Sequence, residues 1–209
     1  YPGSSSMTLK VVFERSSGRI LGAQAVGREG AEKRIDVIAT AMRARMTASD
    51  LTELDLCYAP PYSSAKDPVN MAGYIIENIL EGRVRQVTWD DVAAVAEKGI
   101  RDADEAERPT PPLMLLDCRT DGEFARSHIG GALHIPLDDL RDRLDLLSPD
   151  WEIWVYCQSG LRSYVACRIL AQHGFSCANI AGGYGFYEQT ALDRSVRTDG
   201  VGPCGMAAE

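Results

Sequence analysis

The sequence predicts two consecutive domains, an α+β domain followed by an α/β domain whose parallel sheet is flanked by helices. Its 209 residues exceed the roughly 100 to 150 residues of one common domain. Net charge also changes along the chain: residues 1–88 hold 11 basic and 10 acidic side chains, and residues 89–209 hold 11 and 20. Beyond Gly82 the pattern of hydrophobic residues becomes one of short strands alternating with helices. That alternation is typical of parallel α/β folds.

The first domain is expected to begin with a β-hairpin followed by a helix. Two β-rich runs, residues 8–14 and 19–26, are separated by a short turn signal that contains Ser-Ser-Gly. From Ala31 to Arg45, apolar residues recur at steps of three and four, which predicts a helix. The segment Thr47-Ala-Ser-Asp50 is expected to close that helix.

A proline-rich loop and a second helix complete the first domain. Residues 58–68 contain three prolines, which neither continue a helix nor donate to a sheet. Asp67 is then expected to cap a helix from Pro68 to about Leu80, with proline at its first position.

The second domain is expected to place its chemistry where a strand passes through a short loop into a helix. Its predicted elements are, in order, a helix capped by Thr88 over Trp89–Lys98, a buried strand over Leu113–Cys118, a helix over Asp138–Leu147, a strand over Trp151–Tyr156, and a helix over Arg162–His173.

Composition excludes several classes of protein. Hydrophobic residues at 45% and charged residues at 25% are typical of an ordinary folded domain, and no apolar run approaches the roughly 18 residues of a membrane helix. A net charge of −8 argues against nucleic acid as a partner. The six cysteines form no Cys-x-x-Cys pair and no histidine lies near paired thiols, so we expect a reduced, cytoplasmic protein without a metal site.

The strongest chemical signal is the loop that begins at Cys157. A thiol at the end of a buried strand, followed at once by a helix, meets backbone N–H groups and the positive end of the helix dipole, so its thiolate is favoured. Gly160 lets the backbone curl around the sulfur, and Arg162 offers a positive charge to an anionic substrate or persulfide. We therefore expect Cys157 and Arg162 to be catalytic. The other loop residues are expected to bind substrate: Gln158, Ser159, Gly160, Leu161 and Ser163.

This loop resembles the active-site loop of the rhodanese-like domains. Upstream, Leu115-Leu-Asp-Cys-Arg119 resembles the family's strand ending in Asp-x-Arg, and residues 123–136 resemble its Glu-Phe-x-x-x-His-Ile segment, while Gly182-Gly183 follows the last short strand. From Cys157 to Arg162 the loop has six residues, the size the family uses for sulfur, whereas its phosphatase relatives have seven. The resemblance implies that Cys157 takes up a sulfane sulfur as a persulfide and passes it to an acceptor thiol.

The remaining cysteines are interpreted as packing residues. Cys118 ends a strand, Cys177 begins one, and Cys167 lies on the predicted helix face that covers the sheet. Cys204 is interpreted as an incidental exposed thiol, with a second sulfur carrier as the alternative.

The first 82 residues resemble the dimerisation domain of the pyridine nucleotide-disulfide oxidoreductases, in the coenzyme A-disulfide reductase and NADH oxidase branch. The residues that carry the resemblance are Ile20–Gly27, Lys33–Ala41 and Leu51–Asn70. The resemblance implies a homodimer, in which Tyr1, Tyr58 and Lys66 reach the coenzyme A and redox-cysteine site of the partner subunit. For Tyr58 the alternative is aromatic packing against the prolines of its loop.

Together the two resemblances imply the C-terminal portion of an FAD- and NAD(P)H-dependent reductase of coenzyme A disulfides, persulfides or polysulfides. We expect a dimerisation domain over residues 1–85, a rhodanese-like domain over 86–192 and a flexible tail over 193–209. No Gly-x-Gly-x-x-Gly fingerprint occurs, so this chain alone is expected to bind neither cofactor and to rely on upstream FAD and NAD(P)H domains. The alternatives are a non-catalytic assembly and thiol-docking module, or a stand-alone sulfurtransferase.

Overall fold

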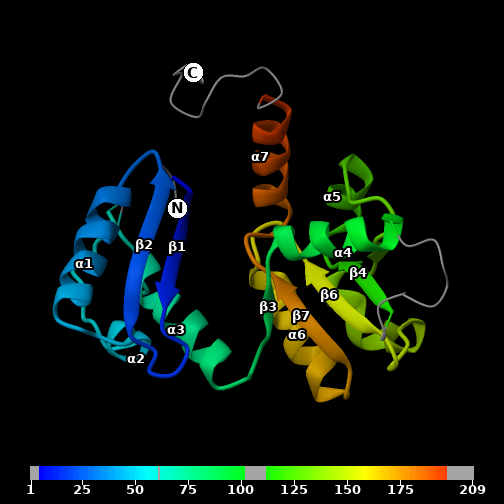
Figure 1. Cartoon of the computed structure of the whole chain (residues 1–209), viewed down its shortest axis with the longest axis horizontal. Helices are drawn as coiled ribbons and strands as arrows, with labels where there is room; N and C mark the ends of the chain where they lie inside the picture. The colour runs from blue at the N-terminus through cyan, green and yellow to red at the C-terminus, as the bar shows by residue number, and fades with distance from the viewer. Residues whose placement is uncertain (1–4, 61, 102–111, 197–209) are drawn as a thin grey trace. The chain divides into compact units, whose positions relative to one another are not determined.

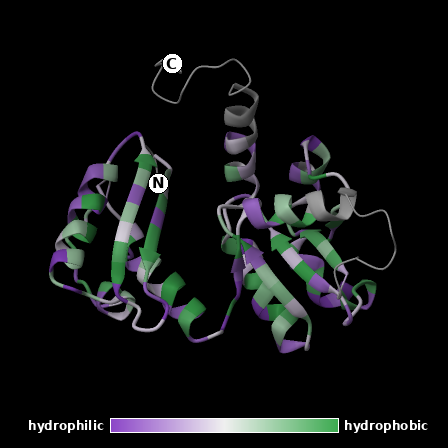
Figure 2. Ribbon diagram, viewed as in Figure 1, coloured by the Kyte–Doolittle hydropathy of each residue, from purple (hydrophilic) through white to green (hydrophobic). Residues whose placement is uncertain are grey.

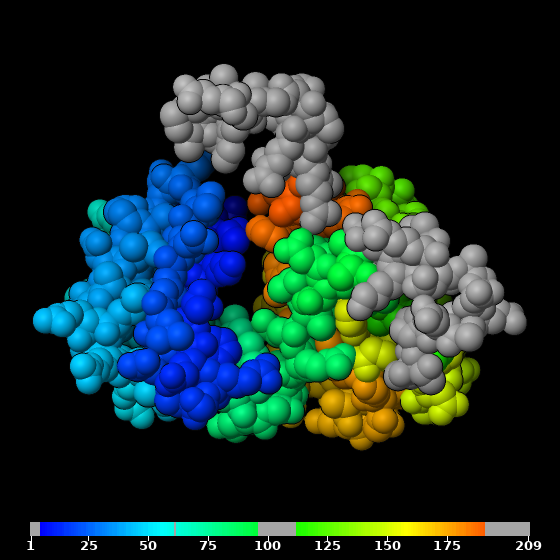
Figure 3. All heavy atoms as spheres, viewed as in Figure 1, coloured from blue at the N-terminus to red at the C-terminus, as the bar shows by residue number. Residues whose placement is uncertain are grey.

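In the computed structural model the chain divides into two units, Tyr1–Arg83 and Val84–Glu209, which are coloured in sequence from blue to red in Figure 3. The structure describes residues 5–60, 62–101 and 112–196, and side chains within these ranges except for 96–101 and 191–196. Tyr1, which was predicted to reach the partner subunit, and Cys204, which was interpreted as an incidental exposed thiol, lie outside the described residues.

The first unit is built on an antiparallel hairpin, β1 (Met7–Phe13) and β2 (Ile20–Gly27), as the sequence predicted. The helices α1 (Ala31–Arg43) and α3 (Pro68–Leu80) pack with it around a core that includes Ile38, Leu51 and Val69. Asp67 caps α3 through a capping box with Asn70, and Pro68 occupies the first turn, so the predicted start of this helix is confirmed.

One local prediction in this unit was wrong. Thr47 and Asp50 do not close the first helix but form the capping box that starts a separate short helix, α2 (Ala48–Thr52). The helix α1 ends earlier, at Arg43, and Arg45 then takes a left-handed φ of 60° that no helix continues. A side-chain acceptor followed three residues later by a carboxylate therefore marks a helix start, even directly behind another helix.

The second unit is a parallel five-stranded sheet in the order β3-β7-β6-β4-β5. Its strands are β3 (Gln86–Val87), β4 (Leu113–Asp117), β5 (Leu133–His134), β6 (Glu152–Tyr156) and β7 (Ser176–Ile180) (Figure 1). Its helices are α4 (Trp89–Arg101), α5 (Asp121–Arg126), the 3₁₀ segment η2 (Leu137–Leu146), α6 (Leu161–Gln172) and α7 (Gly183–Val196).

Both faces of the sheet are buried, which explains the continuous apolar character of β4 and β6 (Figure 2). On one face, residues such as Leu116 and Val155 pack with α6 and η2. On the other face, Trp154 and Tyr156 pack with Trp89 of α4 and Tyr184 of α7. The strand alternation thus assigns Cys118 to the α6 side of the sheet, as its place in the first of these clusters shows.

Two further expectations are corrected here. The helix predicted over Asp138–Leu147 is a 3₁₀ segment with a kink at Arg143, because leucines three residues apart, such as Leu137 and Leu140, face the same core. The flexible tail was predicted to begin at residue 193, but the helix α7 continues to Val196. The rest of that tail lies outside the described residues.

Candidate active site

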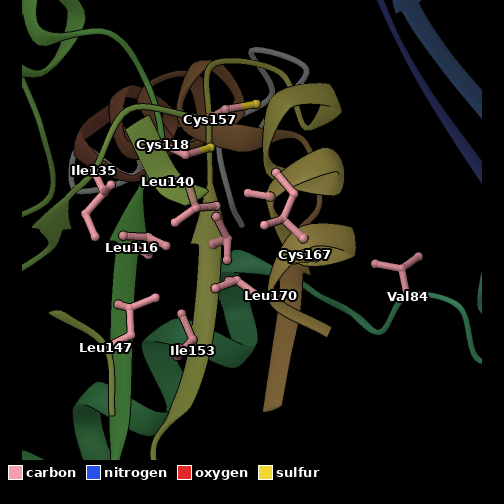
Figure 4. Close-up of a cluster of buried hydrophobic side chains, with 13 residues drawn as sticks. Val84, Leu116, Cys118, Ile135, Leu140, Leu147, Ile153, Cys157, Cys167 and Leu170 are labelled. Atoms are coloured by element: carbon pink, nitrogen blue, oxygen red, sulfur yellow. The ribbon is translucent and has the colours of Figure 1, made fainter. Parts of the chain in front are cut away.

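Cys157 lies where β6 ends and a tight loop leads into α6. Its side chain is 1% exposed, and its sulfur belongs to the core that β4, β6 and α6 enclose (Figure 4). Gly160 caps α6 with a φ of 112°, a left-handed conformation that favours glycine, and this turns the loop backbone around the sulfur. The twelve residues of α6 then direct the positive end of the helix dipole at Cys157.

The sulfur of Cys157 accepts several hydrogen bonds. The Gly160 amide donates to Sγ at 3.1 Å, and the buried Ser163 hydroxyl lies 3.4 Å from the same atom. The neighbouring Cys118 thiol is the largest cause of a pKa of about 4 for Cys157, with Ser163 and Gly160 adding to it and burial opposing it. Cys157 is therefore a thiolate at neutral pH.

Cys118 is the protonated member of this pair. Its thiol donates to the carbonyl oxygen of Tyr156 at 3.3 Å, and the neighbouring Cys157 thiolate, together with burial, raises the pKa of the Cys118 thiol. The amide donors of the loop serve Cys157 alone, because they come from the loop and α6 rather than from β4. The negative charge is thus held on the residue that begins the loop.

Arg162 has an acidic partner. Its guanidinium donates two hydrogen bonds of 2.7 Å to the carboxylate of Glu123, which belongs to α5. The first of several causes that lower the pKa of Glu123 to about 2 is this bidentate pair. Glu123, in the connection that follows β4, therefore fixes the position of the Arg162 guanidinium. The positive charge of Arg162 acts on both the Glu123 carboxylate and the Cys157 thiolate.

The segment that follows β7 holds the loop from outside. The amide of Tyr184 donates to the Cys157 carbonyl at 2.7 Å, and the amide of Gly185 donates to the Gln158 carbonyl at 3.0 Å. Gly183 must be a glycine here, because a Cβ atom would lie 2.5 Å from the Cys157 oxygen and its φ is 60°. The predicted Gly182-Gly183 pair thus acts as a backbone brace for the loop.

A buried ion pair supports the other end of the site. Arg119 is 2% exposed, and its guanidinium binds the carboxylate of Asp117, the last residue of β4, at 2.7 Å. The same side chain reaches Gln158 Oε1 at 3.4 Å. It therefore links the Asp-x-Arg strand end to the cysteine loop.

The substrate-binding residues predicted in the loop differ in exposure. Gln158, Ser159 and Leu161 are exposed at the mouth of the loop, and Leu161 has 64% of its side chain accessible. Ser163 is fully buried against the sulfur, whereas Gly160 is partly buried. The first group is open to a substrate, and the second is placed to stabilise the thiolate.

The predicted residues of the first unit lie near one another in the chain. Tyr58 is exposed, and Lys66 is exposed with its Nζ 4.9 Å from the centre of the Tyr74 ring. Tyr58 has no aromatic contact among those recorded for the described side chains. Both side chains are open to a partner.

Sequence reasoning did not assign a role to Glu123 or Cys118. Cys118 was interpreted as core packing, yet it is a neighbour of Cys157 that lowers the pKa of the Cys157 thiol. The sequence could have predicted that the two cysteines lie close together. Both follow directly on a buried strand, and parallel strands end at the same edge of a sheet. Glu123 carried a weaker signal, as the third residue of a capping box started by Thr120.

Neither a metal cluster nor a membrane segment is found in the part of the chain that the structure describes. No three histidine, cysteine or acidic side chains there are grouped to hold a metal ion. Likewise, no helix among those residues has the length and apolar character needed to cross a bilayer.

Comparison with protein families agrees with the division of the chain. Residues 1–68 match the pyridine nucleotide-disulphide oxidoreductase dimerisation domain, and residues 100–189 match the rhodanese-like domain. The fold class predicted from the sequence is confirmed by these matches and by the parallel sheet.

Individual proteins resemble the chain over part or nearly all of its length. The coenzyme A disulfide reductase of Staphylococcus aureus is 53% identical over 74 residues, 35% of this chain. The crystal structure of reduced Bacillus anthracis CoADR-RHD superposes with a TM-score of 0.82 at 43% identity, over 93% of this chain. An NAD-dependent persulfide reductase from A. fulgidus gives a TM-score of 0.73 at 37% identity, over 90% of this chain.

These relatives are much longer than the chain. The matched region is 17% of the S. aureus enzyme, and it is 32% and 31% of the two solved structures.

Proposed function

Since the chain joins a pyridine nucleotide-disulphide oxidoreductase dimerisation domain to a rhodanese-like domain, we propose that it serves as the C-terminal portion of a reductase of coenzyme A disulfides, persulfides or polysulfides. In this proposal the rhodanese-like domain carries sulfane sulfur as a persulfide on Cys157. The observation that carries the proposal is the Cys157 thiolate, with its pKa of about 4, inside a loop of amide donors.

Sulfur uptake begins with attack of the Cys157 thiolate on a sulfane sulfur. A bond forms between Cys157 Sγ and that sulfur, and the bond from the sulfur to the rest of the donor breaks, so the donor leaves with the electron pair. An acceptor thiolate then attacks the outer sulfur, and Cys157 leaves as a thiolate. Because a low pKa makes Cys157 a good leaving group, the hydrogen bonds that stabilise its thiolate assist this second step.

The dimensions of the loop favour sulfur over phosphate. Six residues from Cys157 to Arg162 place the Gly160 amide 3.1 Å from the sulfur, which leaves a narrow ring for one further atom. A phosphoryl group brings three peripheral oxygens and needs more donors. In this proposal Arg162, fixed by Glu123, attracts anionic donors to the mouth of the ring.

The flavin and the nicotinamide of the proposed reductase are assigned to other domains. The name of the A. fulgidus relative includes NAD dependence, and this chain corresponds to 31% of that protein. This chain is not expected to bind a dinucleotide, because its sequence has no Gly-x-Gly-x-x-Gly fingerprint. FAD and NAD(P)H are therefore expected to bind upstream domains, which deliver electrons to the sulfur substrate.

We propose that the first unit pairs two copies of the protein. Its helix α3 exposes Met71, Ile75 and Leu80, which is more apolar surface than a helix facing water carries. The same unit has an apolar hollow of about 280 Å³, lined by residues of α1, of the turn before α2 and of the chain after α2: Asp36, Val37, Thr40, Ala41, Met46, Leu54 and Leu56. A second copy that covers these surfaces would bring the exposed Tyr58 and Lys66 towards its coenzyme A and redox-cysteine site, where a phenol can donate a proton and an ammonium can bind an anion. We expect Tyr1 to act beside them.

Sulfurtransferase activity of the isolated chain is the direct test. Reduced protein is treated with inorganic polysulfide, desalted and analysed by peptide mass spectrometry, and transfer to a thiol is then followed. We expect one added sulfur atom on the Cys157 peptide, and no addition in Cys157→Ser. Cys177→Ser, which changes a partly buried cysteine of the same domain, is the control and should gain sulfur as the wild type does.

The result also decides between the alternatives. A wild-type chain that binds coenzyme A thiols but never gains sulfur at Cys157 would support the non-catalytic docking module. Sulfur transfer that is as fast in the isolated chain as in a full-length protein supplied with FAD and NAD(P)H would support a stand-alone sulfurtransferase. We also propose that the protein works in a reducing compartment such as the cytoplasm, since its six cysteines form no Cys-x-x-Cys pair and lack the dense spacing of a disulfide framework.

Assembly is tested by sedimentation. We expect a dimer at micromolar concentration, and a shift towards monomer when Ile75 of α3 is changed to aspartate. A monomeric wild-type chain would contradict the pairing role of the first unit.

A further inference from the structure

The cysteines Cys118 and Cys157 are adjacent members of two parallel strands. Asp117 of β4 pairs with Tyr156 of β6, and the Cys118 amide donates to the Tyr156 carbonyl at 3.0 Å, which continues the ladder by one residue. Neighbouring strands lie about 4.8 Å apart, within the roughly 4.4 to 6.8 Å that Cα atoms span in a disulfide. The spacing of the Cα atoms is thus compatible with a bond between Cys118 and Cys157.

Their side chains also lie on the same side of the sheet. Both residues belong to the core cluster that faces α6, and Figure 4 shows their sulfur atoms together at the ends of the two strands. Each is 1% exposed. A thiol from solution therefore has little access to this pair, whereas the two cysteines are neighbours in the sheet.

We propose that Cys118 is a resolving thiol, which converts the persulfide of Cys157 into a Cys118–Cys157 disulfide and releases sulfide. This inference rests on the proposed persulfide at Cys157. It adds a second catalytic cysteine and a redox-modification site to the rhodanese-like domain.

The step is balanced without an external oxidant. The Cys118 sulfur forms a bond to Cys157 Sγ, and the bond between Cys157 Sγ and the outer sulfur breaks. The outer sulfur leaves with the electron pair, takes the Cys118 proton, and departs as hydrosulfide. The sulfane sulfur is reduced, and the Cys118 thiol is oxidised to the level of a disulfide. A dithiol then reduces this disulfide and restores both thiols.

The arrangement explains why Cys118 stays inert until sulfur has been loaded. In the resting site Cys118 is a thiol of raised pKa that donates to the Tyr156 carbonyl, so it is a poor nucleophile, and the neighbouring Cys157 thiolate repels a second negative charge. When Cys157 carries an outer sulfur, the charge moves outwards, towards the amides of the loop. The amides approach Cys157 from the loop and α6, whereas Cys118 approaches from β4, so attack and departure take place on different sides of the sulfur.

Another pair of neighbouring cysteines provides a matched control. Cys167 of α6 and Cys177 of β7 are also in contact, since the Cys177 thiol donates to the Cys167 carbonyl at 3.4 Å. Cys167 is as buried as Cys118 and lies in the same core cluster. The variant Cys167→Ser therefore removes a buried thiol without touching the proposed step.

The experiment follows the full chain through a single loading. Reduced protein under nitrogen is treated with inorganic polysulfide, desalted, and divided for intact mass, non-reducing peptide mapping and a sulfide assay. In samples taken over time, we expect the sulfur first added to wild-type Cys157 to disappear, with a final loss of the mass of two hydrogen atoms and a peptide cross-linked through Cys118 and Cys157. Dithiothreitol should then restore both thiols. Protein kept without polysulfide should stay reduced.

The variants separate this inference from the proposed function. Cys118→Ser and Cys118→Ala should retain the added sulfur on Cys157 and release sulfide only at the level of the blank, while Cys167→Ser should behave as the wild type. If the wild type keeps its persulfide and forms no cross-link, the resolving role is wrong and the sulfur carrier stands. If neither the wild type nor the Cys118 variants ever carry sulfur at Cys157 or form the cross-link, the proposed function itself fails.

Discussion

The replacement Gly183→Ala tests whether the backbone brace positions the cysteine loop. The new Cβ atom would lie 2.5 Å from the Cys157 oxygen and 2.8 Å from both the Gln158 carbon and the Ser159 nitrogen. All three atoms are backbone, so no flexible side chain can move aside. The loop and α7 must separate, which weakens the 2.7 Å hydrogen bond from Tyr184 to Cys157.

The expected loss of stability has two parts. Alanine at the left-handed φ of 60° costs about 1 kcal/mol. Overpacking against a rigid neighbour adds about 1 to 3 kcal/mol. We therefore expect Gly183→Ala to lower the free energy of unfolding of the second unit by about 2 to 4 kcal/mol, and to reduce the rate of sulfur loading on Cys157 about a hundredfold, since the amide donors move with the loop.

Gly174→Ala is the matched control. Gly174 also has a left-handed φ, of 84°, but no atom lies within 4 Å of the position its Cβ would take. This variant should lose only the conformational part, about 1 kcal/mol, and load sulfur at the wild-type rate.

The assay is selective for the second unit. All three tryptophans of the chain, Trp89, Trp151 and Trp154, lie in that unit, so their fluorescence in urea reports its unfolding alone. Sulfur loading is measured on the same preparations by peptide mass. Equal stability and equal loading of Gly183→Ala and Gly174→Ala would refute the idea that close contact at Gly183 positions the loop.

Three other predictions concern charge and loop size. Because the pKa of Cys157 is lowered to about 4, its thiolate persists above that pH, so the rate of sulfur loading should stay constant as the pH falls from about 8 to about 5, whereas an ordinary thiol near 8.5 would lose about tenfold per unit. Cys118→Ala, which removes the largest stabilising contact, should shift this profile to higher pH, and an unshifted profile would contradict that cause. Asp67→Asn keeps the cap of α3 but leaves the buried Arg34 without its counter-ion, and circular dichroism in urea should show a loss of about 3 kcal/mol; a loss below about 1 kcal/mol would mean that the pair contributes little. One glycine inserted after Gly160 should abolish sulfur transfer and tighten binding of phosphate or arsenate, and retained transfer would show that ring size does not select the substrate.

The sequence by itself determined the features that rest on neighbouring residues. The caps at Asp67 and Thr88, the proline that opens α3 and the cysteine loop before α6 all depend on side chains within a few positions of each other, and the structure has each of them as predicted. The same local signal at Thr47 was assigned to the end of one helix when it begins the next, because a capping box does not reveal what precedes it.

Only the tertiary structure decided which residues meet at the cysteine. Strand order brings β4 beside β6 although β5 and η2 come between them in the chain, and this order puts Cys118 next to Cys157. It likewise brings Glu123, 39 residues away, to Arg162, and the glycines after β7 to the outside of the loop. No periodicity records these contacts, because they depend on the order in which parallel strands pack. The residue types of the site could thus be predicted from the loop, whereas the partners that set its charge and its redox chemistry follow from the packing of the sheet.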